Sequence, residues 1–87
     1  MANDSELTMG VKIYAPFKTY FDAQAVSLSA VNQTGPFDIL PHHKNFMSLL
    51  MPCTITVRQL QGVPFTLRVT RGVMHVKADR VTVFLDV

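Results

Sequence analysis

Apolar and polar residues alternate with a period of two through much of this chain. The clearest runs are 54–58, 65–70 and 81–86, in which Val, Ile, Leu or Phe alternates with Thr, Arg or Asp. Residues 26–30 follow the same pattern, with Ser as the polar partner. Successive side chains of an extended strand point to opposite faces, so each run predicts a strand with one buried and one solvated face. Residues 11–13 indicate a further strand near the start of the chain.

Glycine and charged residues separate these runs. Gln61-Gly62 predicts a hairpin, and Lys77-Ala78-Asp79 predicts a second tight turn before the last strand. Arg71-Gly72 predicts a bend where one strand leaves its partner. A further hairpin is predicted at Lys18-Thr19. Short strands joined in this way are typical of sandwiches and barrels.

We therefore predict an all-β fold, a sandwich or a barrel of short strands with little or no helix. A length of 87 residues fits one domain. Residues 1–8 are polar and acidic and are expected to form a flexible N-terminal tail, and residues 9–87 a single all-β domain. Residues 46–51 suit either a helical turn capped by Asn45 or a strand, and the following Pro52 favours a strand or an irregular link. The aromatic residues at 17–21 are expected to pack across the sandwich, with an exposed interface as the alternative.

Composition excludes several classes of protein. The net charge is only +2 and the basic residues are scattered, whereas nucleic-acid binders concentrate them on one face. No apolar stretch approaches the roughly 20 residues of a membrane span, so direct membrane insertion is not expected. Cys53 is the single cysteine, which rules out an internal disulfide and a four-cysteine zinc site.

The residue types that perform catalysis lack a suitable arrangement. Cys53 opens an alternating run directly after Pro52, without a glycine elbow or helix N-terminus to activate it, so we expect it to be buried. Adjacent residues such as His42 and His43 point to opposite faces of an extended chain and do not share a metal ion. We predict no catalytic, cofactor or metal site. A small enzyme built on His43 and Cys53 is the least favoured hypothesis.

The segment Gly-Pro-Phe-Asp-Ile-Leu-Pro-His-His at 35–43 differs from the alternating runs. Its two prolines fix φ and lower the entropy lost on binding. Phe37 and Ile39 are its apolar anchors, Asp38 is expected to brace it, and the histidines form a polar tip. His43 has two equal interpretations, a partner contact or a brace that bonds backbone carbonyls. The candidate partner-binding residues are Gly35, Pro36, Phe37, Asp38, Pro41, His42 and His43.

Four blocks of the sequence resemble the epsilon subunit of F-type ATP synthases. In that family a segment like 35–43 reads Gly, an acidic residue, an apolar residue, Gly, Ile or Val, Leu or Tyr, Pro, Gly or Asn, His. The apolar stretch 46–50 follows at the family's spacing, 72–76 resembles its Gly-Gly-x-x-Glu-Val block, and 81–86 resembles its Val-Thr-Val-Leu-Ala-Asp ending. The resemblance covers about residues 11–87.

This chain departs from the family pattern at several positions. Pro36 stands at the acidic position and Asp38 at a glycine. Arg71 replaces the first glycine of the Gly-Gly pair, and His75 replaces the glutamate. Relatives continue into a C-terminal pair of helices that carries inhibition and, in some members, nucleotide binding. We therefore expect neither inhibition nor a bound nucleotide from this chain.

The resemblance implies a two-sheet β-sandwich of about ten short strands, with residues 9–87 as the single β-sandwich domain. It also implies a non-catalytic central-stalk subunit of an F1Fo ATP synthase. It implies that one surface packs on the gamma subunit, and that the end bearing segment 35–43 approaches the polar loops of the c-ring. Such a subunit couples ion flow through the c-ring to rotation and ATP synthesis, and is cytoplasmic and peripheral to the membrane. The alternative is a free-standing β-sandwich module that binds a protein or another ligand.

Overall fold

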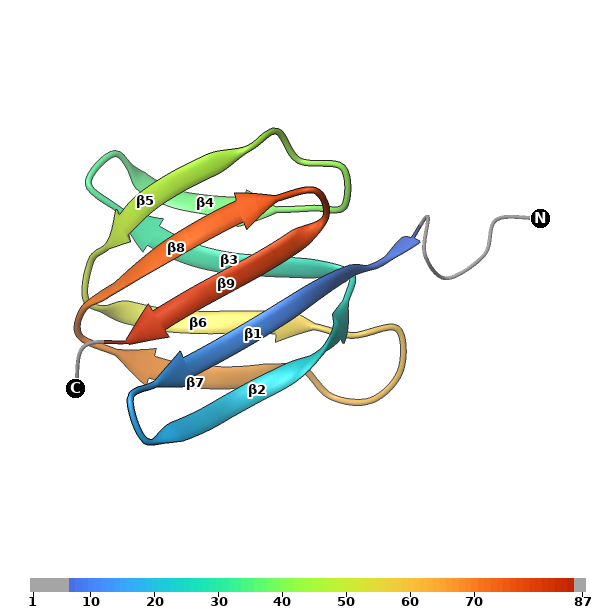
Figure 1. Cartoon of the computed structure of the whole chain (residues 1–87), viewed down its shortest axis with the longest axis horizontal. Coiled ribbons are helices and arrows are strands. Elements are labelled where there is room, and N and C mark those ends of the chain that lie inside the picture. The colour runs from blue at the N-terminus through green and yellow to red at the C-terminus, as the bar shows by residue number, and fades with distance from the viewer. Residues whose placement is uncertain (1–6, 86–87) are drawn as a thin grey trace.

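The computed structural model describes residues 7–85 as two packed β-sheets (Figure 1). Within that range there are nine strands, which confirms the predicted all-β sandwich and is close to the expected ten. The five-stranded sheet has the order β2 (Lys18–Ala25), β1 (Met9–Ala15), β9 (Arg80–Leu85), β8 (Gly72–Lys77) and β5 (Phe46–Leu50). The four-stranded sheet has the order β4 (Gly35–Ile39), β3 (Ser27–Asn32), β6 (Cys53–Arg58) and β7 (Phe65–Val69).

The core fills the space between the inner faces of the sheets. Every second side chain of a strand points into this space, as in β8, where buried and exposed residues strictly alternate. Ile13, Leu28, Ile55, Val57 and Met74 are wholly buried. Cys53 is buried among these apolar groups, as expected. Full burial of such a side chain contributes about 1.5–3 kcal/mol, so the core is the main source of stability.

Neighbouring strands are antiparallel except at one place. The first strand, β1, pairs in parallel with the last, β9, with Val11 opposite Val81. The Gly10 N–H also donates to the Asp79 carbonyl oxygen at 2.9 Å. The N-terminal and C-terminal strands therefore lie side by side at the centre of the five-stranded sheet (Figure 1).

Three predicted connections are confirmed. Residues 59–64, with Gly62 at φ 91°, join the antiparallel pair β6 and β7. Ala78 and Asp79, at φ 52° and 60°, form the two-residue turn between β8 and β9. Residues 70–71 lead the chain from β7 in one sheet to β8 in the other. At the start of β8, a Cβ on Gly72 would lie 2.9 Å from the Phe84 carbonyl oxygen.

The hairpin predicted at Lys18-Thr19 is wrong by two residues. The turn lies at residues 16–17, and Lys18 already pairs with Ala15 as the first residue of β2. Pro16 fits the turn because its ring fixes φ and it has no N–H to offer a ladder. Residues 46–50 form strand β5, so the favoured strand is confirmed and the helical turn is excluded.

Aromatic contacts link the two sheets on both sides of the sandwich. Phe21 of β2 lies 5.0 Å from Phe65 of β7 between ring centroids. Phe37 of β4 lies 5.6 Å from Phe46 of β5. Packing across the sandwich is thus confirmed for Phe21, whereas Phe17 at the turn is fully exposed.

The expected N-terminal tail falls mostly on residues 1–6, which lie outside the described residues. Thr8, the last residue assigned to the tail, is buried, and its hydroxyl lies 3.0 Å from the Gln24 Oε1 atom. It therefore packs against β2 rather than extending into solvent.

Candidate interaction surfaces

The structure divides segment 35–43 into a strand and a connection. Gly35–Ile39 is strand β4, at the edge of the four-stranded sheet, and residues 40–45 lead on to β5. The expectation of one stiff loop is therefore wrong for its first half. An edge strand accepts Pro36, because a residue without an N–H is tolerated where one side of the strand is unpaired.

The candidate residues of β4 face two ways. Phe37 and Ile39 point to the core, so they anchor the strand as expected, while Pro36 and Asp38 are exposed. The Ser29 hydroxyl of β3 donates to the Asp38 Oδ1 atom at 2.5 Å, and the Arg58 guanidinium contacts the same hydroxyl at 3.3 Å. Asp38 thus braces β4 on β3, in agreement with its predicted role.

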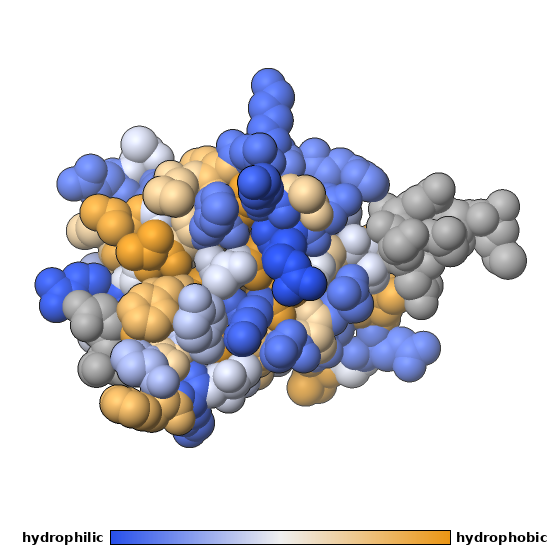
Figure 2. All heavy atoms as spheres, in the orientation of Figure 1, coloured by the Kyte–Doolittle hydropathy of each residue, from blue (hydrophilic) through white to orange (hydrophobic). Residues whose placement is uncertain are grey.

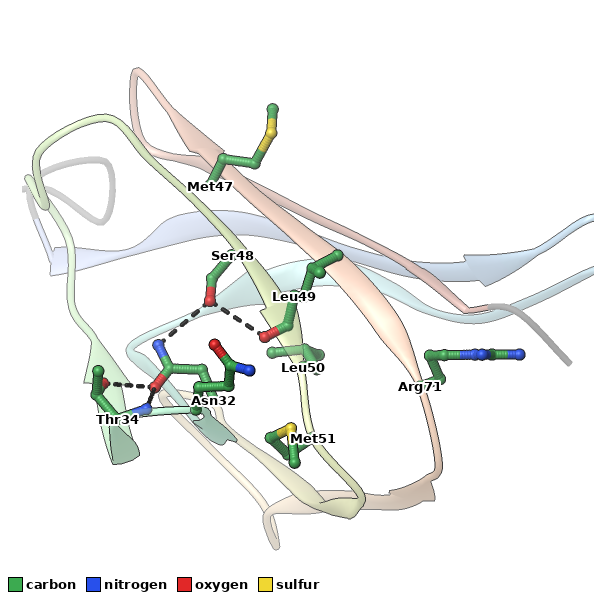
Figure 3. Close-up of a pocket in the computed structure, with 9 residues that line it drawn as sticks. Asn32, Thr34, Met47, Ser48, Leu49, Leu50, Met51 and Arg71 are labelled. Carbon is green, nitrogen blue, oxygen red and sulfur yellow. Dashed lines mark hydrogen bonds between the residues drawn. The ribbon is translucent and has the colours of Figure 1, made fainter.

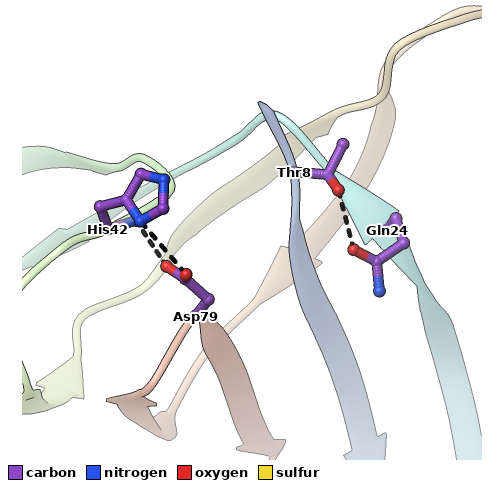
Figure 4. A network of polar contacts seen from close by, with 4 residues as sticks. All are labelled: Thr8, Gln24, His42 and Asp79. Atoms are coloured by element: carbon purple, nitrogen blue, oxygen red, sulfur yellow. Dashed lines mark hydrogen bonds and ion pairs between the residues drawn. The ribbon is translucent and has the colours of Figure 1, made fainter. Parts of the chain in front are cut away.

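His42 connects the 40–45 segment to the β8–β9 turn (Figure 4). Its backbone N–H donates to one Asp79 carboxylate oxygen at 2.5 Å, and its ring Nδ1 lies 3.3 Å from the other. The residue has φ 69°, in the left-handed region. The ATP synthase pattern places Gly or Asn here, which are the residues that adopt this conformation most readily.

His43 makes the contacts of a brace. Its N–H donates to the Leu40 carbonyl oxygen at 3.2 Å, and its ring Nδ1 lies 2.8 Å from the Lys44 carbonyl oxygen. The ring packs edge-on to Phe46 at 5.6 Å between centroids. These contacts fit the bracing role, and the role of His43 as a partner contact stays a prediction.

A second surface, which sequence reasoning missed, lies on the outer face of the five-stranded sheet. Strand register places Leu49 opposite Val73, Val73 opposite Phe84, and Phe84 opposite Tyr14. Leu49 is 71% exposed and Met47, beside it on β5, is 67% exposed. We call Met47, Leu49, Val73, Phe84 and Tyr14 the apolar band. Figure 2 shows this face, with hydrophobic residues gathered towards the left of the view.

Basic residues occupy the other part of the same face. Lys77 lies directly opposite Arg80 on the β8–β9 hairpin, and His75 lies opposite Thr82. Lys12 lies opposite Thr82 from the other side and its ammonium group stacks on the Tyr14 ring at 5.1 Å. Hydrophilic residues accordingly fill the centre of the view in Figure 2.

The outer face of the four-stranded sheet has a different character. It carries Thr54, Thr56, Thr66 and Arg68, which are short polar or charged groups at register positions opposite one another. Such a face is well solvated, whereas contiguous exposed apolar groups mark interaction sites. The apolar band is therefore the stronger candidate for a protein interface.

A hollow of about 490 Å³ lies at the end of the sandwich near the apolar band (Figure 3). Asn32 organises its polar side: it donates to the Ser48 hydroxyl at 3.2 Å and accepts from the Thr34 hydroxyl at 2.7 Å. A shallower hollow beside it shares Leu49 and Arg71 in its lining. The apolar surface thus continues from the sheet face around this end.

Among residues 7–85 there is no cluster of three or more His, Cys, Asp or Glu side chains that could hold a metal ion. No helix in the described part of the chain is long and apolar enough to cross a membrane.

Comparison with known proteins places the chain by family. Residues 8–87 match the family described as ATP synthase, Delta/Epsilon chain, beta-sandwich domain. The chain belongs to this family. It is 34% identical over 70 residues to ATP synthase epsilon chain 2 of Paraburkholderia xenovorans (strain LB400), covering 79% of this chain and 50% of that protein. It is 24% identical to the ATP synthase epsilon chain of Clostridium novyi (strain NT), covering 91% of this chain and 60% of that one.

Solved structures of the ATP synthase family share the fold. A chain of the Tetrahymena thermophila mitochondrial ATP synthase central stalk and c-ring superposes with a TM-score of 0.74 at 18% identity, covering 88% of this chain and 62% of that one. A chain of the Euglena gracilis mitochondrial ATP synthase superposes with a TM-score of 0.84 at 14% identity, covering 91% and 51%. The chain spans half to three fifths of the length of the curated relatives it matches.

Proposed function

We propose that the chain is a non-catalytic central-stalk subunit of an F1Fo ATP synthase. In this role it binds the gamma subunit and the c-ring, and couples ion flow through the c-ring to rotation and ATP synthesis. It is then cytoplasmic and peripheral to the membrane through the complex, with residues 9–87 as one domain. The match of residues 8–87 to the ATP synthase delta/epsilon family is the observation that carries the proposal.

We assign the gamma subunit to the apolar band. Leu49 and Met47 expose most of their surface, and burying apolar area contributes about 25 cal/mol per Å². A sheet face presents many side chains on a hydrogen-bonded backbone support, which suits a joint that transmits torque. The band thus combines the two properties that the role requires.

The c-ring contact is assigned to segment 35–43 and the ends of the sandwich it reaches. Gly35 and Pro36 lie at one end of β4, and Pro41, His42 and His43 lie beyond the other end. One end of the sandwich cannot present all seven candidate residues at once. The ring therefore contacts one of the two groups, together with the turns that surround it.

Co-purification tests the gamma assignment. The chain is co-expressed with the gamma subunit of the same genome, as wild type and as Leu49→Asp. A charge at the centre of an interface should weaken binding about 30-fold or more, which corresponds to a hot-spot loss of about 2 kcal/mol. Thr66→Asp on the opposite outer face is the matched control and should bind as wild type does. A folded wild-type chain that fails to bind gamma contradicts the proposal and favours a free-standing binding module.

Cross-linking tests the c-ring assignment. A cysteine is placed at Pro36 or at His42, with Cys53 replaced by Ala, and at Thr56 as control. We expect a cross-link to the c subunit from one of the first two positions and none from Thr56. Equal yields from all three positions would contradict the assignment.

A further inference from the structure

Two basic residues oppose each other at the β8–β9 hairpin. Lys77 and Arg80 are direct partners in the strand register, immediately beside the turn. Like charges directly opposite each other on a sheet destabilise the pair. Folding alone would favour an acid at one of these positions, so the pair points to a requirement outside the folded chain.

Among residues 7–85, no acidic side chain forms an ion pair with Lys77 or Arg80. A shallow hollow of about 330 Å³ lies between its residues and is lined by His75, Lys77, Ala78, Arg80 and Thr82. Of the acids on neighbouring elements, Asp22 lies opposite Lys12 on the far side of β1, and the Asp79 carboxylate contacts His42. Position 75, which holds a glutamate in the family pattern, is a histidine here. We call His75, Lys77, Arg80 and Lys12 the basic corner.

We infer that the basic corner receives acidic side chains of the partner that covers the apolar band. The hollow between Lys77 and Arg80 fits a carboxylate held by two cations, and Thr82 adds a hydroxyl that donates to it. The partner is a protein surface with an apolar strip bordered by Asp or Glu. This inference rests on the proposed function in taking the outer face of the five-stranded sheet as the docking face.

Geometry favours a protein over a lipid surface or a nucleic acid. The strand register places the apolar band and the basic corner side by side on one face of the sheet. A protein that binds a membrane surface instead inserts its apolar face into the bilayer, below the charged groups. A nucleic-acid site uses a stripe of phosphate contacts, and the apolar band would have no role in it. An acidic protein surface uses both halves of the face.

The substitution Lys77→Glu tests the inference with two opposite readouts. It converts the repulsive pair with Arg80 into an attractive one, so the melting temperature should rise by about 2–5 °C. Binding to the gamma subunit of the same genome should weaken at least about 10-fold, with most of the loss in the association rate at low salt. Arg68→Glu, a change at an exposed residue opposite Thr54 on the other outer face, should leave binding within about twofold. A purely structural role for Lys77 predicts no loss of binding.

A result in which Lys77→Glu binds gamma as tightly as wild type, with the same salt dependence, would overturn the inference and leave the proposed function intact. Failure of the wild-type chain to bind gamma counts against the proposed function instead. In that case the probe is a helical peptide with a Leu strip flanked by Glu, compared by NMR with the same peptide flanked by Lys. We expect the Glu peptide to shift the amide resonances of Val73, His75 and Thr82. It should bind about 10-fold more tightly than the Lys peptide. Equal binding of both peptides, or tighter binding to phosphatidylserine vesicles or duplex DNA, would overturn it.

Discussion

Gly72 begins β8 at a point where the backbone of β9 comes unusually close. A Cβ at this position would lie 2.9 Å from the Phe84 carbonyl oxygen and 3.0 Å from a Leu85 methyl group. The carbonyl belongs to the ladder and cannot move without lengthening its hydrogen bonds. The need for glycine here is therefore steric.

Gly72→Ala should lower the free energy of unfolding by about 1–3 kcal/mol, the usual cost of an overpacked site. The measurement is the midpoint of urea unfolding. Gly10→Ala is the control, because its Cβ would meet only the Gln24 amide at an ordinary 3.6 Å and should change stability far less. Equal losses at both glycines would contradict the steric explanation.

Single residues were predictable from sequence where their role is local. Cys53 follows the alternation into the core, and Gly72 was identified as the site of a bend. The link between His42 and Asp79 was not predictable, since it joins residues 37 apart in sequence through two turns. The sequence pattern contains no signal for a contact of that kind.

At the scale of elements, the β8–β9 turn holds two non-glycine residues in an unfavourable backbone conformation. Ala78 has φ 52°, where its Cβ crowds the backbone, and its neighbour Asp79 also has a positive φ. Two-residue hairpin turns of this kind favour Asn at the first position. We predict that Ala78→Asn raises the free energy of unfolding by about 0.5–1 kcal/mol.

The opposite change provides the control for this turn. Ala78→Val places a β-branched side chain at the same φ and should lower the free energy of unfolding by about 1 kcal/mol or more. Both variants are measured by urea unfolding. If both shift stability in the same direction, the backbone conformation is not the cause.

Strand β4 has an unpaired edge, and Pro36 removes one backbone N–H from the strand. Edge strands that present regular donors and acceptors pair with other chains. Pro36→Thr should therefore increase self-association at high concentration, measured by sedimentation velocity. Pro36→Lys restores the same N–H but adds a charge and should remain monomeric. Association of the Lys variant to the same extent would show that the proline does not protect this edge.

The elements that sequence predicted best are those with strict alternation. Strands β6 and β7 were identified because each alternates without interruption, and β9 because only Phe84 breaks its alternation. Strand β8 was not among the alternating runs, because apolar residues lie on both of its faces. Strand β4 was missed because Gly35 and Pro36 are turn-forming residues that an edge strand nonetheless tolerates. The hairpin at 16–17 was displaced because Lys18 and Thr19 are exposed on the outermost strand and carry no burial pattern.

At the scale of the whole molecule, the two sheets are joined at both sides by aromatic pairs. Phe21 and Phe65 lie on one side, and Phe37 and Phe46 on the other. A double-mutant cycle of Phe21→Leu and Phe65→Leu should give a coupling energy of about 0.5–1.5 kcal/mol in urea unfolding. Phe21 and Phe46 do not share a ring contact, so the stability losses caused by Phe21→Leu and Phe46→Leu should add within about 0.5 kcal/mol. Equal coupling in both cycles would mean that the rings act through the core as a whole.

The apolar band, our candidate interaction surface, is a property of the whole molecule and could not be predicted from the sequence. Leu49, Val73, Phe84 and Tyr14 lie far apart in the chain and meet only through the register of four strands. The exposed position of Phe84 is visible in the alternation of 81–86, but its neighbours are not. Segment 35–43 was a better sequence signal because its residues are contiguous.

The parallel pairing of β1 with β9 has a consequence for folding during synthesis on the ribosome. Strand β1 is synthesised before the other strands, and it can pair with β9 only after Arg80–Leu85 has been synthesised. Val11, for example, pairs with Val81, which lies 70 positions later in the chain. Chains emerge at about 5–20 residues per second, so the β1–β2 hairpin spends several seconds with one edge open. Pairings between distant segments also form slowly. This interval is when the nascent chain is most exposed to aggregation, and when a chaperone at the exit tunnel would protect it best.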